Sequence, residues 1–157
     1  MPSRLSKLRL LTLAFLVISG TAQAKREEPA RLDLPANATA TQLAEQRGQI
    51  EIALKDADAY AEMRASDRKQ VRDSLDGMAG RIEAAGSLAE LADADRKALL
   101  AQQDDVNDIL ETARNDSRMI CTREKEMGSN FRRSVCMTVA QRRRAADHAR
   151  TLTQPQS

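Results

Sequence analysis

Residues 119–138 read MICTREKEMGSNFRRSVCMT, and this stretch decides how the chain folds at its C-terminal end. Gly128 and Ser129 suit the two central positions of a type II′ turn. In strands that pair around this turn, the residue numbers of each facing pair add up to the same total as 128 and 129. Cys121 therefore lies opposite Cys136. Facing residues lie about 4.5 to 5.5 Å apart at Cα, which a disulfide tolerates. The stretch therefore predicts a β-hairpin closed by a Cys121–Cys136 disulfide.

The other face of this hairpin is apolar in the same register. Ile120 pairs with Met137, Thr122 pairs with Val135, and Phe131 points the same way. We expect this face to pack against helices. We also expect the disulfide to contribute roughly 3 kcal/mol, as chain entropy predicts for a closed loop of about 15 residues.

The region before the hairpin has a helical pattern. Apolar and small residues recur with 4-3 spacing from Leu43 to Ala85, which predicts one long amphipathic helix or two helices joined near residue 65. Ser87 opens a sequence typical of a capping box, and Asp93 or Asp95 suits the N-cap of a following helix. The short connection favours an antiparallel helical hairpin over residues 39–116. Because large aliphatic residues are sparse, we predict that the chain forms a homodimer along the helical stripe.

Both ends of the chain give clear signals. Residues 1–24 have a positive start, a short apolar core and an Ala-Gln-Ala end, as in a signal peptide. Residues 25–38 contain two prolines and no period, so we predict a disordered or extended segment. Residues 117–152 hold the Cys-containing β-hairpin and a short basic helix that Thr138 and Gln141 cap, before a disordered tail at 153–157. The fold class is mostly α, and we expect the exported protein in the periplasm or outside the cell.

Part of this C-terminal region resembles a known kind of tail. The matching residues are Asn115 to Cys121, then Arg123-Glu124, Gly128-Ser129 and Cys136-Met137-Thr138. The same order occurs in small, uncharacterised exported proteins of proteobacteria. The resemblance implies export and a paired-cysteine tail, and it implies no activity.

Charge divides the chain into two parts. Residues 25–113 carry 12 basic and 19 acidic side chains, whereas residues 114–157 carry 10 basic and 4 acidic ones. Five arginines of the second part are candidate anion-binding residues: Arg132, Arg133, Arg142, Arg143 and Arg144. They could bind phosphates of lipid or, less readily without aromatic neighbours, of nucleic acid. The interpretation that we favour is a solvated helix that pairs with the acidic helical part.

Three other patterns could carry chemistry, and we favour a plain structural interpretation of each. Asp104, Asp105 and Asp108 match the DDxxD motif of diphosphate-binding synthases, but a solvated acidic helix face fits this chain better. The single histidine, His148, lies in the basic helix with no triad partners in the sequence. The two cysteines, flanked by Met119 and Met137, could bind Cu(I), although a disulfide is the commoner outcome in an oxidising compartment.

These patterns give an expectation of function without a named partner. Aromatic residues make up 2% of the chain, which disfavours an aromatic-lined substrate pocket. A mean hydropathy of −0.54 excludes a multi-span membrane protein. We predict an exported, non-enzymatic interaction or structural module with no catalytic residues, cofactor or metal, and with an unknown protein partner. The alternative is an anion-binding envelope accessory protein that acts through its basic tail.

Overall fold

The computed structural model describes residues 30–153 apart from residues 126 and 129. The predicted signal peptide and residues 154–157 of the predicted tail lie outside this part of the chain. The described elements are α1 (Ala40–Ala53), α2 (Ala65–Ala85), the 3₁₀ turn η1 (Leu88–Glu90), α3 (Asp93–Ser117), β1 (Met119–Lys125), β2 (Arg132–Thr138) and α4 (Val139–Thr153). This order confirms the predicted fold class.

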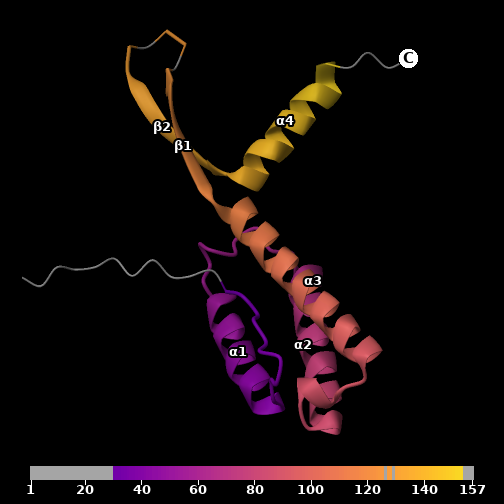
Figure 1. Ribbon diagram of the computed structural model, residues 1–157. Coiled ribbons are helices and arrows are strands. Elements are labelled where there is room, and N and C mark those ends of the chain that lie inside the picture. Colours follow the sequence, from indigo (N-terminus) through magenta and orange to yellow (C-terminus); the bar gives the residue numbers. More distant parts are fainter. Residues whose placement is uncertain (1–29, 126, 129, 154–157) are drawn as a thin grey trace, which may run out of the picture.

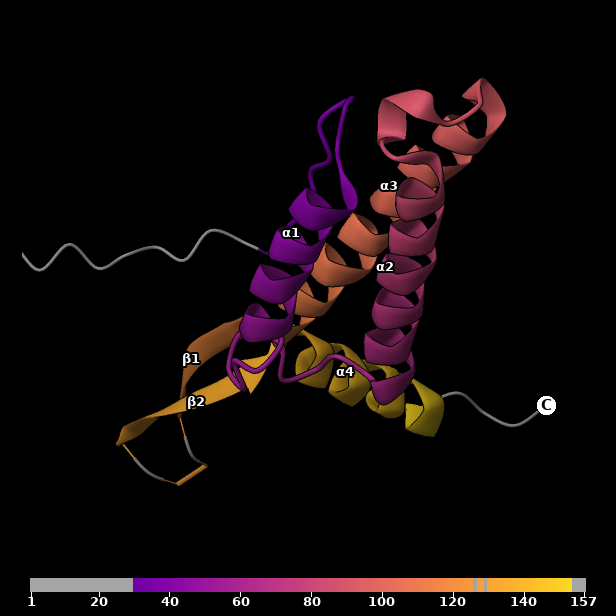
Figure 2. The same ribbon diagram turned by 90° about the horizontal axis from the view of Figure 1, so that it is seen from below.

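Helices α1, α2 and α3 lie side by side and form, with the segment before them, a helical body of residues 30–117 (Figures 1 and 2). The predicted helical hairpin is α2 and α3, joined through η1. The first helical region is two helices rather than one, and residues 54–64 separate them. In that loop the Asp56 carboxylate accepts hydrogen bonds from the backbone N–H groups of Asp58 and Ala59. Such local bonds compete with helix formation.

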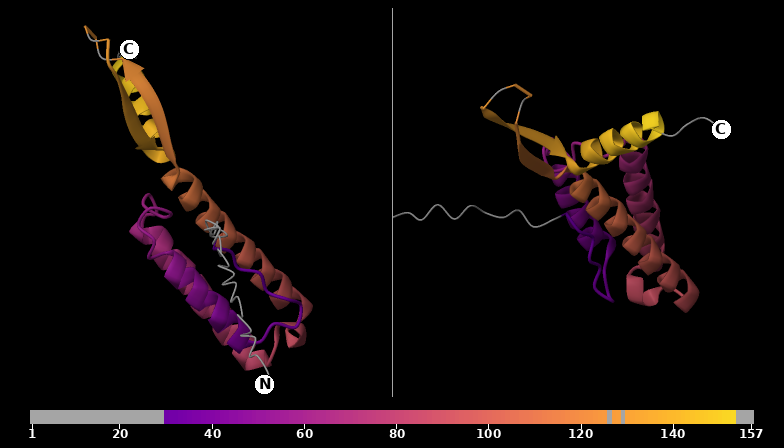
Figure 3. Two further views of the ribbon diagram at one scale, coloured as in Figure 1. Left: turned by 90° about the vertical axis from the view of Figure 1, so that its left-hand side faces the viewer. Right: turned by 90° about the horizontal axis from the view of Figure 1, so that it is seen from above.

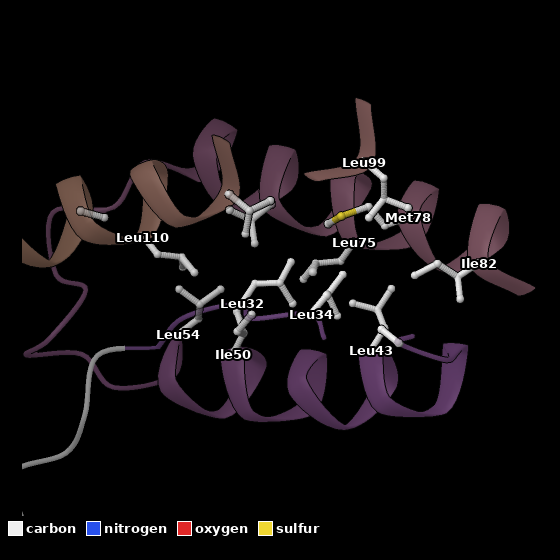
Figure 4. Close-up of a cluster of buried hydrophobic side chains, with 14 of the residues drawn as sticks. Leu32, Leu34, Leu43, Ile50, Leu54, Leu75, Met78, Ile82, Leu99 and Leu110 are labelled. Carbon is white, nitrogen blue, oxygen red and sulfur yellow. The ribbon is translucent and has the colours of Figure 1, made fainter. Parts of the chain in front are cut away.

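The described part of the N-terminal segment, which was predicted to be disordered or extended, packs against the helical body. Residues 30–38 contain a turn at 36 and 37 but no helix or strand, and Leu32 and Leu34 point into the core from a position between α1 and α3 (Figure 4). The side chain of Asn107 accepts from the Leu32 N–H at 2.8 Å and donates to the Leu32 carbonyl at 2.9 Å. Gln103 accepts from the Leu34 N–H at 2.9 Å. Amide side chains thus take the place of a neighbouring strand for this part of the predicted disordered segment.

Leu32 and Leu34 also enlarge the core beyond the one that the sequence predicted. All three large residues of the predicted dimer stripe, Leu43, Ile50 and Leu54, are buried within one chain. Figure 4 shows them opposite side chains of α2 and α3, with Leu32 and Leu34 between. The stripe that suggested a dimer is therefore already covered.

The helix ends around η1 differ in part from the predicted caps. Gly86 has a φ of +95° and is the C-cap of α2, a position where glycine is common. No side-chain cap bond comes from Ser87, and Ala92 is the N-cap of α3. Ser87 is thus the N-cap of η1 without the side-chain bond of a capping box, and the predicted N-cap at Asp93 or Asp95 is wrong. Both aspartates instead lie in the first turn of α3, where carboxylates interact favourably with the helix dipole.

The rest of the described chain forms a projecting tail, residues 118–153. Strands β1 and β2 pair antiparallel with Cys121 opposite Cys136, which confirms the predicted register. The hairpin and α4 diverge from the end of α3 like the arms of a V, and both extend beyond the helical body (Figures 1 and 3). A hydrogen bond of 3.0 Å from the Val139 N–H to the Arg118 carbonyl joins the start of α4 to the start of the hairpin.

Candidate functional surface

The two cysteines form a disulfide on the outer surface of the hairpin. Cys121 and Cys136 are bonded to each other, and both residues are exposed. Neither sulfur carries a thiolate that could bind Cu(I), so the copper interpretation is wrong for this state of the protein. A disulfide fits a protein that resides in an oxidising compartment.

The apolar face of the hairpin does not join the core. Ile120, Thr122, Val135 and Met137 are half-buried, and Phe131 is 86% exposed. The buried core contains residues of the helical body and no residue of β1 or β2. The strands leave the end of α3 and run away from the helical body, so the helix that lies against this face is α4 and not one of the core helices. The Arg142 guanidinium of α4 donates to the Thr122 hydroxyl at 3.0 Å.

The five candidate anion-binding arginines do not form one site. Arg132 and Arg133 lie at the start of β2, next to the outer end of the hairpin. Arg142, Arg143 and Arg144 lie in the first turns of α4, at the base of the tail. Six residues of strand separate Arg132 from the end of β2, which corresponds to about 20 Å. The two groups therefore start from opposite ends of β2, although the Arg142 side chain reaches Thr122 of the hairpin.

Two of the three arginines at the base, Arg143 and Arg144, are paired with carboxylates of the helical body. Arg143 donates two hydrogen bonds to Asp116, at 2.8 and 3.1 Å. Arg144 lies 2.9 Å from a carboxylate oxygen of Glu62. The Arg144–Glu62 contact pairs the basic helix with the acidic part of the chain, as expected, whereas Asp116 itself lies at the start of the basic part.

Glu62 contacts α3, β2 and α4, a role that no sequence pattern indicated. Its carboxylate accepts from the Thr138 hydroxyl at 2.7 Å and pairs with Arg144. Its backbone N–H donates to the Ser117 hydroxyl at 2.9 Å. The hydrogen bond from Thr138, followed by the one from Arg144, lowers the pKa of Glu62 below its ordinary value. The residue comes from the loop between α1 and α2, where no periodicity or motif could have identified it.

Thr138 has a second role at the same place. Its hydroxyl accepts from the Gln141 N–H at 3.0 Å, and the Gln141 side chain accepts from the Thr138 N–H at 3.0 Å. The predicted capping box of α4 is confirmed. Because the capping hydroxyl also binds Glu62, the start of α4 is fixed both to the hairpin and to the helical body.

The remaining candidate residues lie in solvent. Asp104, Asp105 and Asp108 are exposed on α3, which confirms the solvated acidic face, and His148 is exposed on α4. Over the described ranges, no group of three or more His, Cys, Asp or Glu side chains could hold a metal ion. Nor is any described helix long and apolar enough to cross a membrane.

One open cleft of about 730 Å³ lies where the α1–α2 loop meets the end of α3. Its lining has three acidic and three basic side chains: Asp56, Asp58, Glu111, Arg31, Arg114 and Arg118. Tyr60 follows the lining residue Ala59 in the sequence. It is buried, and this burial raises the pKa of its hydroxyl. The cleft borders Ala30, the first residue that the structure describes. Its mixed charge favours no ligand class.

Comparison with known proteins yields no match: no family model, no curated protein and no solved structure matches this chain.

Proposed function

We propose that this chain is an exported, non-enzymatic interaction module in which the helical body holds the projecting tail as the contact element. The single observation that carries this proposal is the position of the hairpin. It projects beyond a body whose core contains none of its residues, and it presents exposed apolar and basic side chains. An element that added only stability would bury its apolar face.

The compartment is part of the same proposal. The leader-like residues 1–24 and the tail's resemblance to exported proteobacterial proteins support a periplasmic or secreted location, and the exposed disulfide is consistent with it. A two-stranded hairpin is marginal by itself, so the disulfide keeps the contact element formed outside the protection of a core.

The alternative, an anion-binding envelope accessory protein that acts through the basic C-terminal tail, has less support at α4. Arg143 and Arg144 already pair with Asp116 and Glu62. An incoming phosphate would have to displace both carboxylates, which are held on the helical body.

Site-specific photocrosslinking in an expressing bacterium tests the proposal. The crosslinking amino acid is placed at Arg132 or His148 in the tail and, as a matched control, at the exposed Lys97 of the body. We expect adducts to molecules other than this chain from the tail positions. Adducts only from Lys97, or at equal frequency from Lys97 and the tail, would contradict the proposal.

A further inference from the structure

The outer end of the hairpin carries two large apolar side chains in solvent. Met127 is fully exposed and Phe131 is 86% exposed, and they stand on either side of Gly128, whose φ is +84°. Figures 1 and 3 show this end of the hairpin pointing away from α1, α2 and α3. Neither side chain can therefore be covered by the helical body of the same chain.

Basic residues lie directly behind this apolar end. Lys125 is paired with Arg132 across the strands, and Arg123 is paired with Ser134. Facing residues and alternate residues of a strand share a face, so these three cations lie on the face that carries the disulfide. All three are exposed.

Carboxylates are absent from that face among the described strand residues. Glu124, the one acidic residue of β1 and β2, is paired with Arg133 on the opposite face. Counted over residues 119–138, the sequence has four basic and two acidic side chains. The end of the hairpin thus combines an apolar point with a cationic face.

From this arrangement we infer that the hairpin docks end-on at an anionic phospholipid surface; the inference rests on the proposed role of the tail as a contact element. Phe131 and Met127 enter the boundary between headgroups and acyl chains, where amphipathic surface elements bury their apolar side chains. Arg123, Lys125 and Arg132 remain at the level of the headgroups. Basic residues close to an anionic leaflet are attracted to it within about a Debye length.

The shape of the end favours a lipid surface over a protein or nucleic acid. A stable protein interface buries about 800 Å² on each partner, whereas a single aromatic side chain buries about 150–250 Å². Among the described residues, the narrow end of this two-stranded ribbon offers two large apolar side chains, Phe131 and Met127. Single-stranded nucleic acid binds through successive stacked bases, and one phenylalanine supplies no such platform. Insertion of two side chains into a bilayer needs no complementary pocket.

Vesicle co-sedimentation tests this inference. The protein is recovered after export, and its N-terminus and intact disulfide are checked by mass spectrometry. It is mixed with vesicles of phosphatidylcholine and phosphatidylglycerol at 3:1, or of phosphatidylcholine alone. We expect binding to the anionic vesicles that weakens steeply with salt. The Met127→Ser/Phe131→Ser variant should bind at least about tenfold more weakly, as the loss of two buried apolar side chains implies.

Matched variants separate this effect from general changes of hydrophobicity and charge. Ile52→Ser removes a 69% exposed side chain from α1, and it should bind as the unaltered protein does. Lys125→Gln/Arg132→Gln should lose anionic-vesicle binding, whereas Lys55→Gln/Lys97→Gln, which removes the same charge from the body, should retain it. This pair keeps the test informative if the apolar double variant fails to fold.

Three results would overturn the inference: no binding to anionic vesicles, equal binding by both hairpin variants and the unaltered protein, or equal losses in the body controls. Tail crosslinks to a protein, combined with no vesicle binding, would keep the interaction module and exclude its lipid partner. Failure of both experiments would remove the module as well.

Discussion

The helical body and the projecting tail are stabilised in different ways. The body buries an apolar core from six consecutive segments, and Leu32, Val71, Leu75 and Leu99 are fully inaccessible. In the described part of the tail the buried residues are Thr138 and Ala140, and a disulfide and a few polar contacts near Glu62 hold the tail in place. The free energy gained by burying apolar surface scales with the buried area, so most of the folding free energy belongs to the body. The tail can therefore expose apolar side chains without loss of the fold.

The largest expected effect follows from a cavity in the body. Leu75→Ala should lower the free energy of unfolding by about 2–5 kcal/mol, because Leu75 is fully buried between α1 and α3. Val135→Ala in the half-buried hairpin should cost well under half as much. Urea denaturation followed by circular dichroism measures both variants. Equal losses would mean that the tail belongs to the same cooperative core.

The N-terminal segment gives the next largest effect. Asn107→Ala removes the two side-chain bonds to the backbone of Leu32, and we expect a loss of about 1–2 kcal/mol. Asp108→Ala, one residue further on the solvated face of α3, is the matched control and should change stability by less than about 0.5 kcal/mol. A stability loss no larger for Asn107→Ala than for Asp108→Ala would show that residues 30–38 do not contribute to the body.

A smaller effect is expected where the tail is attached. Glu62→Gln weakens the contacts with Thr138 and Arg144 and should cost about 1 kcal/mol. Because the folded state lowers the pKa of Glu62, its contribution is present above the unfolded value of 4.5 and is lost as the pH falls below it. The stability difference between the unaltered protein and Glu62→Gln should thus shrink from pH 6 to pH 3. A difference that stays constant over this range would exclude the ionised Glu62 contact.

The smallest effect on stability should come from the end of the hairpin. Phe131→Ser should change the free energy of unfolding by less than about 0.5 kcal/mol, since the side chain is 86% exposed. Thermal melting of this variant against Leu152→Ser, on the comparably exposed end of α4, measures it. A loss above 1 kcal/mol would show that Phe131 packs against the fold and is unavailable as a contact residue.

Local rules predicted the tail better than they predicted the body. The Cys121–Cys136 register follows from counting outward from the Gly128 turn, and the Thr138–Gln141 capping box depends on residues three positions apart. Both are properties of neighbours in the sequence. The direction in which the hairpin leaves α3 is not such a property, so the sequence did not predict which helix lies against its apolar face.

The body depends on contacts that no local pattern contains. Leu32 and Leu34 alternate as in a strand, but their partners Asn107 and Gln103 are 75 and 69 residues away. The prolines nearby favour a disordered or extended segment, and without these two leucines the core has few large residues, which is the reason that the sequence suggests a dimer. The pairing of Arg143 and Arg144 with carboxylates was predicted from charge alone, whereas the identity of Glu62 required the structure.

Hydrogen exchange measured by mass spectrometry on the oxidised and the reduced protein tests most directly whether the tail is stabilised separately. Reduction of Cys121–Cys136 removes a constraint of roughly 3 kcal/mol from a loop of about 15 residues. We expect faster exchange in residues 119–138, with the exchange of α1, α2 and α3 unchanged. Equal acceleration throughout α2 and α3 would contradict the account, because the disulfide would then be stabilising the body as well.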